Sequence, residues 1–302
     1  MIPRHLQADS GLTFRMFIVM FVLTATYLGF LAFLAAAGVD FIGLAFFAVI
    51  MMGAQYFFSD KLVLLSSGAH EVSPEQAPEL HARIERLAQQ MGIPKPKVAI
   101  METDIPNAFA TGRDLKNSVI AVTTGIMGRL DGPELDGVLA HELSHIANRD
   151  VMVMTIASFF STIAFFLVRW LMWMPFMGGG RRDGDRDNSG SAIMLVWFVS
   201  IIVWTISMLL LRALSRYREL AADRGSALTT GAPSTLASAL QKISGAIARI
   251  PQQDLRDVQG ASAFFIIPVT SREFWANLVS THPSLEERLR QLESMQADME
   301  RP

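Results

Sequence analysis

Hydrophobic residues gather in four long runs along the chain, and polar residues fill the stretches between them. The runs cover residues 14–36, 41–58, 151–168 and 192–211, with a short break at 38–40 after the first. About 20 consecutive apolar residues are enough for a helix to cross a bilayer. The pattern therefore predicts four transmembrane helices, arranged as two hairpins.

Two alternatives stay open for these runs. The first run and "AAAG" at 35–38 could form a cleaved signal peptide, although the run is longer than the usual apolar core of ~7–15 residues. The second hairpin could instead pack on a soluble domain, because the run at 151–168 is short and has polar edges. A linker rich in Gly and Arg, residues 178–191, joins its two halves.

The remaining stretches have the periodicity of a soluble domain. Residues 73–92 predict a helix with Ser73 as N-cap, Pro74 in the first turn and Gly92 as its stop. The other expected elements are strands at 97–104 and 117–125, with 105–112 between them, and helices at 130–150, 233–249 and 281–299. The predicted fold class is mostly α, of the α+β kind, with four transmembrane helices and a domain that carries a small β-sheet.

The pattern also divides the chain into four segments. They are an N-terminal region with the first hairpin (1–58), the first part of the soluble domain (59–150), the second hairpin with its linker (151–211) and the second part of the soluble domain (212–302).

Composition supports a membrane protein and excludes some partners. Of the 302 residues, 51% are apolar and the mean hydropathy is positive, which is unusual for a soluble chain. A net charge of −2, without a long run of one sign, argues against a nucleic-acid partner. Cysteine is absent, so a metal ion would need His, Asp or Glu as ligands.

The sequence HELSH at 141–145 has the spacing of a zinc hydrolase motif. Residues four apart on a helix lie on the same face, so His141 and His145 can bind one ion. Glu142 is rotated by about 100° from His141 and can reach a water molecule without being a ligand. The HExxH pattern therefore predicts two zinc ligands and a general base, and the alternative is a chance pair of surface histidines.

A catalytic zinc needs a third protein ligand, which Glu219 could supply. Asp223 lies one helical turn further and could accept a hydrogen bond from the distal nitrogen of a histidine ligand. In the alternative, both carboxylates are solvated partners of Arg216 or Arg224.

The spacing to the apolar runs predicts where this site lies. His145 precedes Val151 by about 9 Å of helix, and Glu219 follows Leu211 by about 12 Å. If the ligand-bearing helices continue the third and fourth spans, they hold the metal in water just above the bilayer.

The set of motifs resembles the HtpX-type integral membrane zinc metalloproteases, relatives of the CAAX prenyl endopeptidases. The resemblance rests on "HELSHIANRD" (141–150), two apolar segments, "SRYRELAADRGSA" (215–227) and "THPSLEERL" (281–289), and it covers essentially the whole chain. It implies a gluzincin-like protease domain with one Zn²⁺ per chain, the ligands being His141, His145 and Glu219 and the catalytic glutamate being Glu142.

Two further parts of the site are expected. His282 is a candidate donor to the oxyanion of the transition state, supported by Arg288, and the alternative is that His282 shapes the turn before Pro283. An exposed edge strand is expected at Asn107, Ala108, Phe109 and Ala110, where a substrate backbone could pair. The alternative there is an ordinary hairpin.

Basic residues flanking the runs predict the orientation. Arg4, Arg15, Lys61, Arg149, Arg212, Arg216 and Arg218 lie on the side that holds the soluble domain and both termini. The positive-inside tendency makes that side cytoplasmic, although Arg181, Arg182 and Arg186 in the linker oppose it. The resemblance implies a multi-pass protein of the bacterial inner membrane with a cytosolic active site.

The resemblance implies a function in proteolytic quality control of misfolded or damaged membrane proteins. It also implies self-cleavage. The expected partners are protein substrates, especially membrane proteins, and the lipid bilayer. One alternative is processing at a defined site, as the CAAX proteases do. The other is a zinc-dependent membrane scaffold without catalysis, which would not need Glu142. Residues 250–275 receive no role, since "ASAFFIIPV" (261–269) could be a lid, a membrane-dipping segment or core.

Overall fold

A computed structural model describes residues 10–37, 68–173, 186–249 and 282–301, together with single residues between 46 and 67. The chain forms two compact units. One contains residues 56–153 and 215–302, and the other contains residues 10–55 and 154–214. The expected second span at 41–58, the linker up to residue 185 and the segment 250–275 lie largely or wholly outside the described residues.

The unit of residues 10–55 and 154–214 is built from long apolar helices. Its described helices are α1 (Ser10–Ala36), most of α6 (Asp150–Trp173) and the first part of α7 (Arg186–Thr230). Phe30 and Leu34 of α1 pack with buried side chains of α6 and α7, while Phe17, Phe21 and other large apolar side chains are exposed. Exposed apolar rings on a long helix suit a lipid environment rather than water.

Two described helices are long and apolar enough to cross a membrane, those at Gly11–Ala36 and within Ile193–Thr230. A third is obtained if the bent helix α6 counts as one span. The last residues of the expected linker belong to α7, which begins at Arg186.

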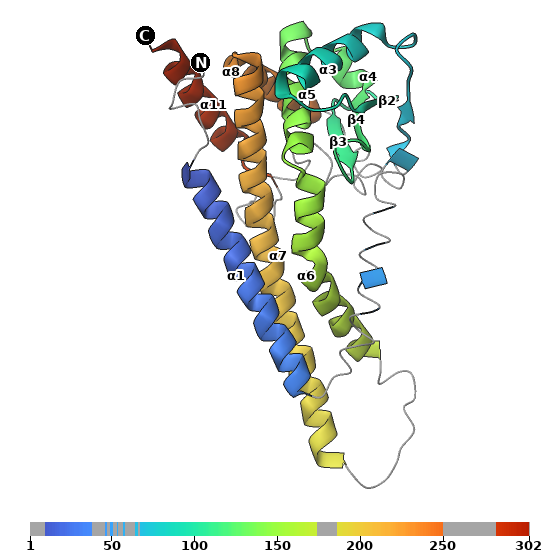
Figure 1. Cartoon of the computed structure of the whole chain (residues 1–302), viewed down its shortest axis with the longest axis vertical. Coiled ribbons are helices and arrows are strands. Elements are labelled where there is room, and N and C mark those ends of the chain that lie inside the picture. Colours follow the sequence, from blue (N-terminus) through green and yellow to red (C-terminus); the bar gives the residue numbers. More distant parts are fainter. Residues whose placement is uncertain are drawn as a thin grey trace. The chain divides into compact units, whose positions relative to one another are not determined.

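The other unit contains a four-stranded mixed sheet (Figure 1). Its strands are β1 (His70–Glu71), β2 (Lys97–Met101), β3 (Ala108–Gly112) and β4 (Ser118–Thr123), in the order β1-β2-β4-β3. β2 runs parallel to β4, with Ala99 opposite Ala121, and β3 runs antiparallel to β4, with Ala110 opposite Ile120. The segment at 105–112 therefore contains β3, one of the two edge strands of the described sheet.

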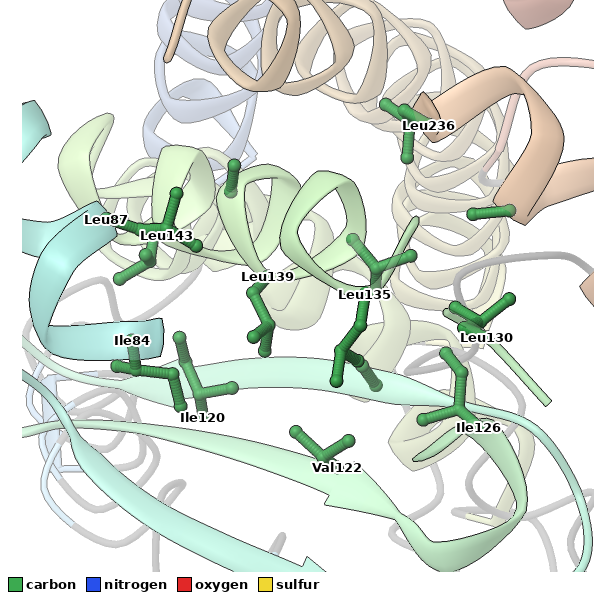
Figure 2. Close-up of a cluster of buried hydrophobic side chains, with 14 of the residues drawn as sticks. Ile84, Leu87, Ile120, Val122, Ile126, Leu130, Leu135, Leu139, Leu143 and Leu236 are labelled. Carbon is green, nitrogen blue, oxygen red and sulfur yellow. The ribbon is translucent and has the colours of Figure 1, made fainter. Parts of the chain in front are cut away.

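Among the described residues, five helices lie wholly within this unit, which also includes the first residues of α6 and the last part of α7. They are α3 (Pro78–Met91), α4 (Thr124–Met127), α5 (Gly132–Ala147), α8 (Pro233–Ile247) and α11 (Leu285–Glu300). α5 lies at the centre, because it contacts α3, α8, β3 and β4 (Figure 1). Figure 2 shows Leu135 and Leu139 of α5 pointing toward the strand of Ile120 and Val122, and Leu143 belongs to the same buried cluster. These leucines recur at every fourth position, which places one face of α5 in the core.

Helix ends follow the expected local signals except at one start. Gly92 ends α3 in the left-handed conformation, with φ of 69°, and the Ser284 side chain caps α11, as expected. The predicted start of α3 at Ser73 was wrong, because Ser73 and Gln76 form a hydrogen-bonded turn and the helix begins at Pro78. The second proline, Pro78, lies four residues after Pro74 and occupies the first helical position.

The N-terminus of α5 is fixed by a capping box. The Asp131 side chain accepts from the Glu134 N–H, and the Glu134 carboxylate accepts from the Asp131 N–H. Glu134 also accepts hydrogen bonds from Ser238 and Lys242 of α8. Burial acts to raise the pKa of Glu134, but the Lys242 and Ser238 hydrogen bonds outweigh it and hold the pKa below its ordinary value.

We expect Glu134→Ala to destabilise the protein by about 0.5–2 kcal/mol, the usual range for a lost cap. A carboxylate with a depressed folded-state pKa contributes stability above its unfolded pKa and loses it as pH falls through the folded value. The difference from the wild type should therefore be largest near neutral pH and shrink below about pH 4. Thermal unfolding of the full chain in detergent at several pH values measures it, and a difference independent of pH would contradict the assignment.

Candidate metal centre

α5 presents two histidines from one buried face. His141 is 1% exposed, and the side chain of His145 is 18% exposed. The two Nε2 atoms lie 3.2 Å apart, and the rings meet edge to face. The four-residue spacing therefore brings both rings together, as expected from the sequence.

Glu219 on α7 completes a cluster of three. Its Oε2 lies 3.6 Å from His141 Nε2, and its Oε1 lies 3.4 Å from His145 Nε2. One ligand atom from each residue falls within 4.8 Å of the others. Two nitrogens bound to one tetrahedral zinc at ~2.0–2.1 Å are separated by roughly 3.3 Å, so the observed spacing has the size of a zinc site.

The outer nitrogens of both rings face carboxylates. His141 Nδ1 lies 2.9 Å from Asp223 Oδ1, and His145 Nδ1 lies 2.6 Å from Asp150 Oδ2. An N–H facing a carboxylate assigns the proton of the neutral ring to Nδ1, which leaves a lone pair on each Nε2. Two lone pairs 3.2 Å apart repel unless a cation lies between them. The donor set therefore fits a divalent metal ion.

Buried ion pairing surrounds the cluster. Arg288 of α11 donates from Nε and Nη2 to the two oxygens of Asp223, at 2.8 and 2.6 Å, and is 1% exposed. Its Nη1 lies 3.8 Å from Glu219 Oε2. Glu219 and Asp223 are buried, which excludes the alternative that they are solvated partners of nearby arginines. Arg288 therefore binds Asp223 and lies beside Glu219, and its expected support of His282 stays a prediction.

Small residues let α5 and α7 approach closely. The Ser226 hydroxyl donates to the Gly137 carbonyl oxygen at 2.6 Å. A Cβ atom at Gly225 would lie 2.2 Å from Ser144 Oγ and 2.8 Å from Ser144 Cβ. Ser144 adjoins His145 and is buried, so this contact sets the spacing between the two helices that carry the cluster.

We expect Gly225→Ala to destabilise the protein by about 1–3 kcal/mol through overpacking, and to lower its metal content. Gly245→Ala is the matched control, since that glycine is exposed in α8 and a Cβ there meets nothing within 4 Å. The control should be neutral or stabilising by up to about 1 kcal/mol. Ser144→Gly should partly rescue Gly225→Ala. Thermal unfolding of Gly225→Ala, Gly245→Ala and the double variant Ser144→Gly/Gly225→Ala measures stability, and elemental analysis of the same samples measures metal content. An unperturbed Gly225→Ala would contradict the packing argument.

Glu142 lies on α5 between the two histidines and is 4% exposed. Burial raises the pKa of its carboxyl group above the ordinary value, partly offset by the charges of His141 and His145. The backbone of Ala110 in β3 hydrogen-bonds to Glu142. The edge strand and the expected general base are therefore in direct contact.

The free side of β3 is defined by its backbone pairing. The Thr123 N–H donates to the Asn107 carbonyl oxygen, and the Asn107 N–H donates to the Thr123 hydroxyl. Backbone direction alternates along a strand, so Phe109 also pairs with β4, whereas Ala108, Ala110 and Gly112 direct their N–H and C=O groups away from it. Of the four residues expected to bind substrate, Ala108 and Ala110 direct their backbone groups away from β4. Asn107, Ala108 and Phe109 are buried, so the strand lies at an edge of the described sheet but is not exposed as expected.

His282 lies beside the cluster, with Nδ1 3.1 Å from Glu219 Oε2. Pro283, which follows it, is buried. The position places the ring within reach of the metal-binding side of Glu219, and it is compatible with both roles expected from the sequence.

Sequence reasoning missed two residues of the centre, Asp150 and Arg218. Arg218 pairs with the other oxygen of Asp150. Asp150 was missed because a continuous helix from 130 into the third span was expected, and on such a helix Asp150 would not face His145. In the structure α5 ends at Ala147 and α6 begins at Asp150. The expectation that the histidine-bearing helix continues the third span was therefore wrong. A polar Asn-Arg-Asp sequence just before an apolar run is the signal that could have indicated the break.

Comparisons with known proteins agree with this geometry. Residues 74–296 match the family profile described as Peptidase family M48. The chain is 56% identical over 298 residues to "Protease HtpX homolog" of Moorella thermoacetica, which covers 98% of each chain. It is also 56% identical over 296 residues to "Protease HtpX homolog 2" of Methanosarcina acetivorans, covering 98% of this chain and 99% of that one.

A solved structure is similar in fold. The crystal structure of S. mikatae Ste24p matches with a TM-score of 0.56 at 20% identity, over 93% of this chain and 65% of that one. At this level of identity the match concerns the fold alone.

Proposed function

Because the chain belongs to peptidase family M48, a family of zinc metalloendopeptidases, we propose that it hydrolyses peptide bonds of misfolded membrane proteins at the cytosolic face of a bacterial inner membrane. The chain is an HtpX-type membrane metalloprotease. The metal is one Zn²⁺ per chain, held by His141, His145 and Glu219 in a gluzincin-like site. The observation that carries the proposal is the convergence of two Nε2 lone pairs and one carboxylate within 4.8 Å, next to Glu142.

Each residue of the site has a stated role in this proposal. When bound, zinc supplies Lewis acidity that polarises the scissile carbonyl and makes a water molecule more acidic. The Glu142 carboxylate accepts a proton from the attacking water and then delivers it to the nitrogen of the leaving amine. Asp223 holds His141 through its Nδ1–H, which keeps Nε2 available as a ligand atom.

His282 is proposed to donate a hydrogen bond to the oxyanion that forms on the carbonyl. Its distance of 3.1 Å to Glu219 supports a place at the metal-binding side. Under this role His282→Gln lowers kcat and keeps the metal. Loss of metal from that variant would instead assign His282 to the support of Glu219.

The substrate is proposed to pair with the open edge of β3 as an added strand. Ala108 and Ala110 direct backbone groups away from β4, and the Ala110 backbone also contacts Glu142. A pocket lined by Ala110, Gly112 and His145 lies beside the strand. Backbone pairing reads few side chains, so it suits unfolded segments of many sequences.

N-methylation of a peptide substrate tests this pairing. A methyl group on an amide that faces β3 removes the donor, and we expect cleavage to fall by about tenfold, the value of one net hydrogen bond of ~1 kcal/mol or slightly more. Methylation one residue away should have little effect, because that amide faces outward. Scanning a single cleavable peptide position by position gives the pattern. Equal loss at neighbouring positions would contradict strand pairing.

The proposed topology has four spans, with both termini and the protease domain in the cytoplasm. The two long apolar helices and the bent α6 support it, together with the basic residues at their protein-domain ends. The chain contains no cysteine, so single cysteines introduced at residues 40 and 184 can be labelled in intact cells with a membrane-impermeant maleimide. Labelling from outside is expected at both positions. Protection of residue 40 would contradict the first hairpin, and protection of residue 184 would contradict the second.

A comparison of cleaved peptides separates the functions. Membranes from cells that express the wild type or Glu142→Gln are digested in parallel, and new peptide ends are sequenced. Quality control predicts many ends in unrelated membrane proteins, including ends within this chain. A single recurring end would favour processing at a defined site, and no difference between the two membranes would favour a scaffold.

A further inference from the structure

The metal ligand His145 has a partner of its own on the chain, Asp150. The His145 Nδ1–H donates to Asp150 Oδ2 at 2.6 Å, and Asp150 is 8% exposed. The other oxygen of Asp150 pairs with Arg218, which is 5% exposed. A buried carboxylate is stabilised when both of its oxygens are engaged by a cation and by an N–H donor.

A break in the chain delivers Asp150 to this position. On a continuous helix Asp150 would lie five residues after His145, rotated by about 140° away from it. α5 instead ends at Ala147, Arg149 adopts a left-handed φ of 55°, and α6 begins at Asp150. Such a backbone costs roughly 1 kcal/mol or more for a residue other than glycine, so other contacts must stabilise it. The Asp150 contacts to His145 and Arg218 are the observed candidates.

The arrangement repeats the one around the other histidine ligand. Arg288 engages Asp223, and Asp223 accepts from His141 Nδ1. Arg218 differs from Arg288 in its place on the chain, because it directly precedes the third ligand Glu219. The Arg218–Asp150 pair thus connects two ligands. Arg218 is the neighbour of Glu219 in the chain, and Asp150 accepts a hydrogen bond from His145.

We propose that Asp150 and Arg218 are a positioning pair that fixes the His145 ring in its Nδ1–H form and couples it to Glu219. In this role neither residue is itself a metal ligand, because the described cluster of ligand atoms consists of His141, His145 and Glu219. This inference rests on the proposed metal site. Outer partners of this kind change metal affinity by about 10–100-fold, so that loss is expected when the pair is removed.

Equilibrium competition with a chromophoric zinc chelator on the full chain in detergent tests the pair. Asp150→Asn and Asp150→Ala should weaken zinc binding by about 10-fold and up to 100-fold, respectively. Asp150→Ala also strands a buried Arg218 cation, so the double variant Asp150→Ala/Arg218→Met separates the two causes. The double variant should bind zinc as weakly as Asp150→Ala, and recovery of wild-type affinity would overturn the positioning role.

Asp131→Ala is the matched control, because Asp131 also lies at a helix start but caps α5 away from the cluster. It should lower the unfolding temperature of the metal-free protein and leave zinc affinity unchanged. Cobalt substitution adds a second readout, since the visible absorption bands of Co²⁺ report ligand geometry and should shift in Asp150→Asn but not in Asp131→Ala.

Different results would refute the metal site and the positioning pair. A wild type that binds no zinc would refute the proposed site. A wild type that binds tightly, with Asp150 variants of equal affinity and unchanged cobalt bands, would refute only the positioning pair.

Discussion

Glu142→Gln is expected to lower peptide hydrolysis by about 10²–10⁴-fold while zinc stays bound, because the amide keeps the shape of the side chain but cannot accept a proton. Glu142 is buried against the edge strand, with its neighbours on α5 pointing their nitrogens at the metal site. The carboxylate is not among the three groups that converge there. The loss should therefore appear in kcat, with little change in KM or in metal content.

The measurement is cleavage of an unfolded, fluorogenic protein substrate by the full chain in detergent, with zinc determined on the same samples. Glu134→Gln is the matched control, since Glu134 is equally buried on the same helix but serves its N-terminal cap. It should retain most activity at neutral pH. Activity that survives in Glu142→Gln, or falls equally in both variants, would refute the general-base assignment.

Removal of a metal ligand is expected to have the largest effect of any single substitution. His141→Phe or Glu219→Ala leaves two protein ligands, and zinc affinity should fall further than the ~10–100-fold typical of an outer partner. Activity then drops to background, because neither the carbonyl nor the water is activated. The Glu219 substitution also leaves Arg288 without one of its nearby carboxylates, so some loss of stability should accompany it.

Elemental analysis of the purified variants measures this loss, with His81→Gln as the control. His81 is also buried, but its Nε2 contacts the Val72 carbonyl oxygen far along the chain from the cluster. The control should bind zinc as the wild type does. Stoichiometric zinc in His141→Phe or Glu219→Ala would contradict the ligand set.

The parts of the site that depend on local periodicity could be predicted from the sequence. His141 and His145 are one helical turn apart, so their proximity follows from helix geometry alone. Glu219 and Asp223 have the same spacing, and the structure brings them to the two rings. Helix ends with a strong signal, such as Gly92 and Ser284, were also predictable.

The parts that depend on tertiary context could not be predicted. The break at Arg149 lies between two strongly periodic segments, and the contacts that favour it include that of Asp150 with distant Arg218, which no local pattern shows. Arg288 reaches Asp223 from a helix 65 residues away, a pairing that no local pattern contains. The start of α3 at Pro78 was decided between two similar proline signals by a turn at Ser73.

X-ray absorption at the zinc edge of the purified full chain tests the central claim most directly, namely that one ion is held by His141, His145 and Glu219. The account predicts one zinc per chain, with two imidazole nitrogens at ~2.0–2.1 Å, carboxylate oxygen at ~2.0–2.2 Å and one imidazole fewer in any zinc that His145→Phe retains. A spectrum without imidazole scattering, or one that His145→Phe leaves unchanged, would contradict it.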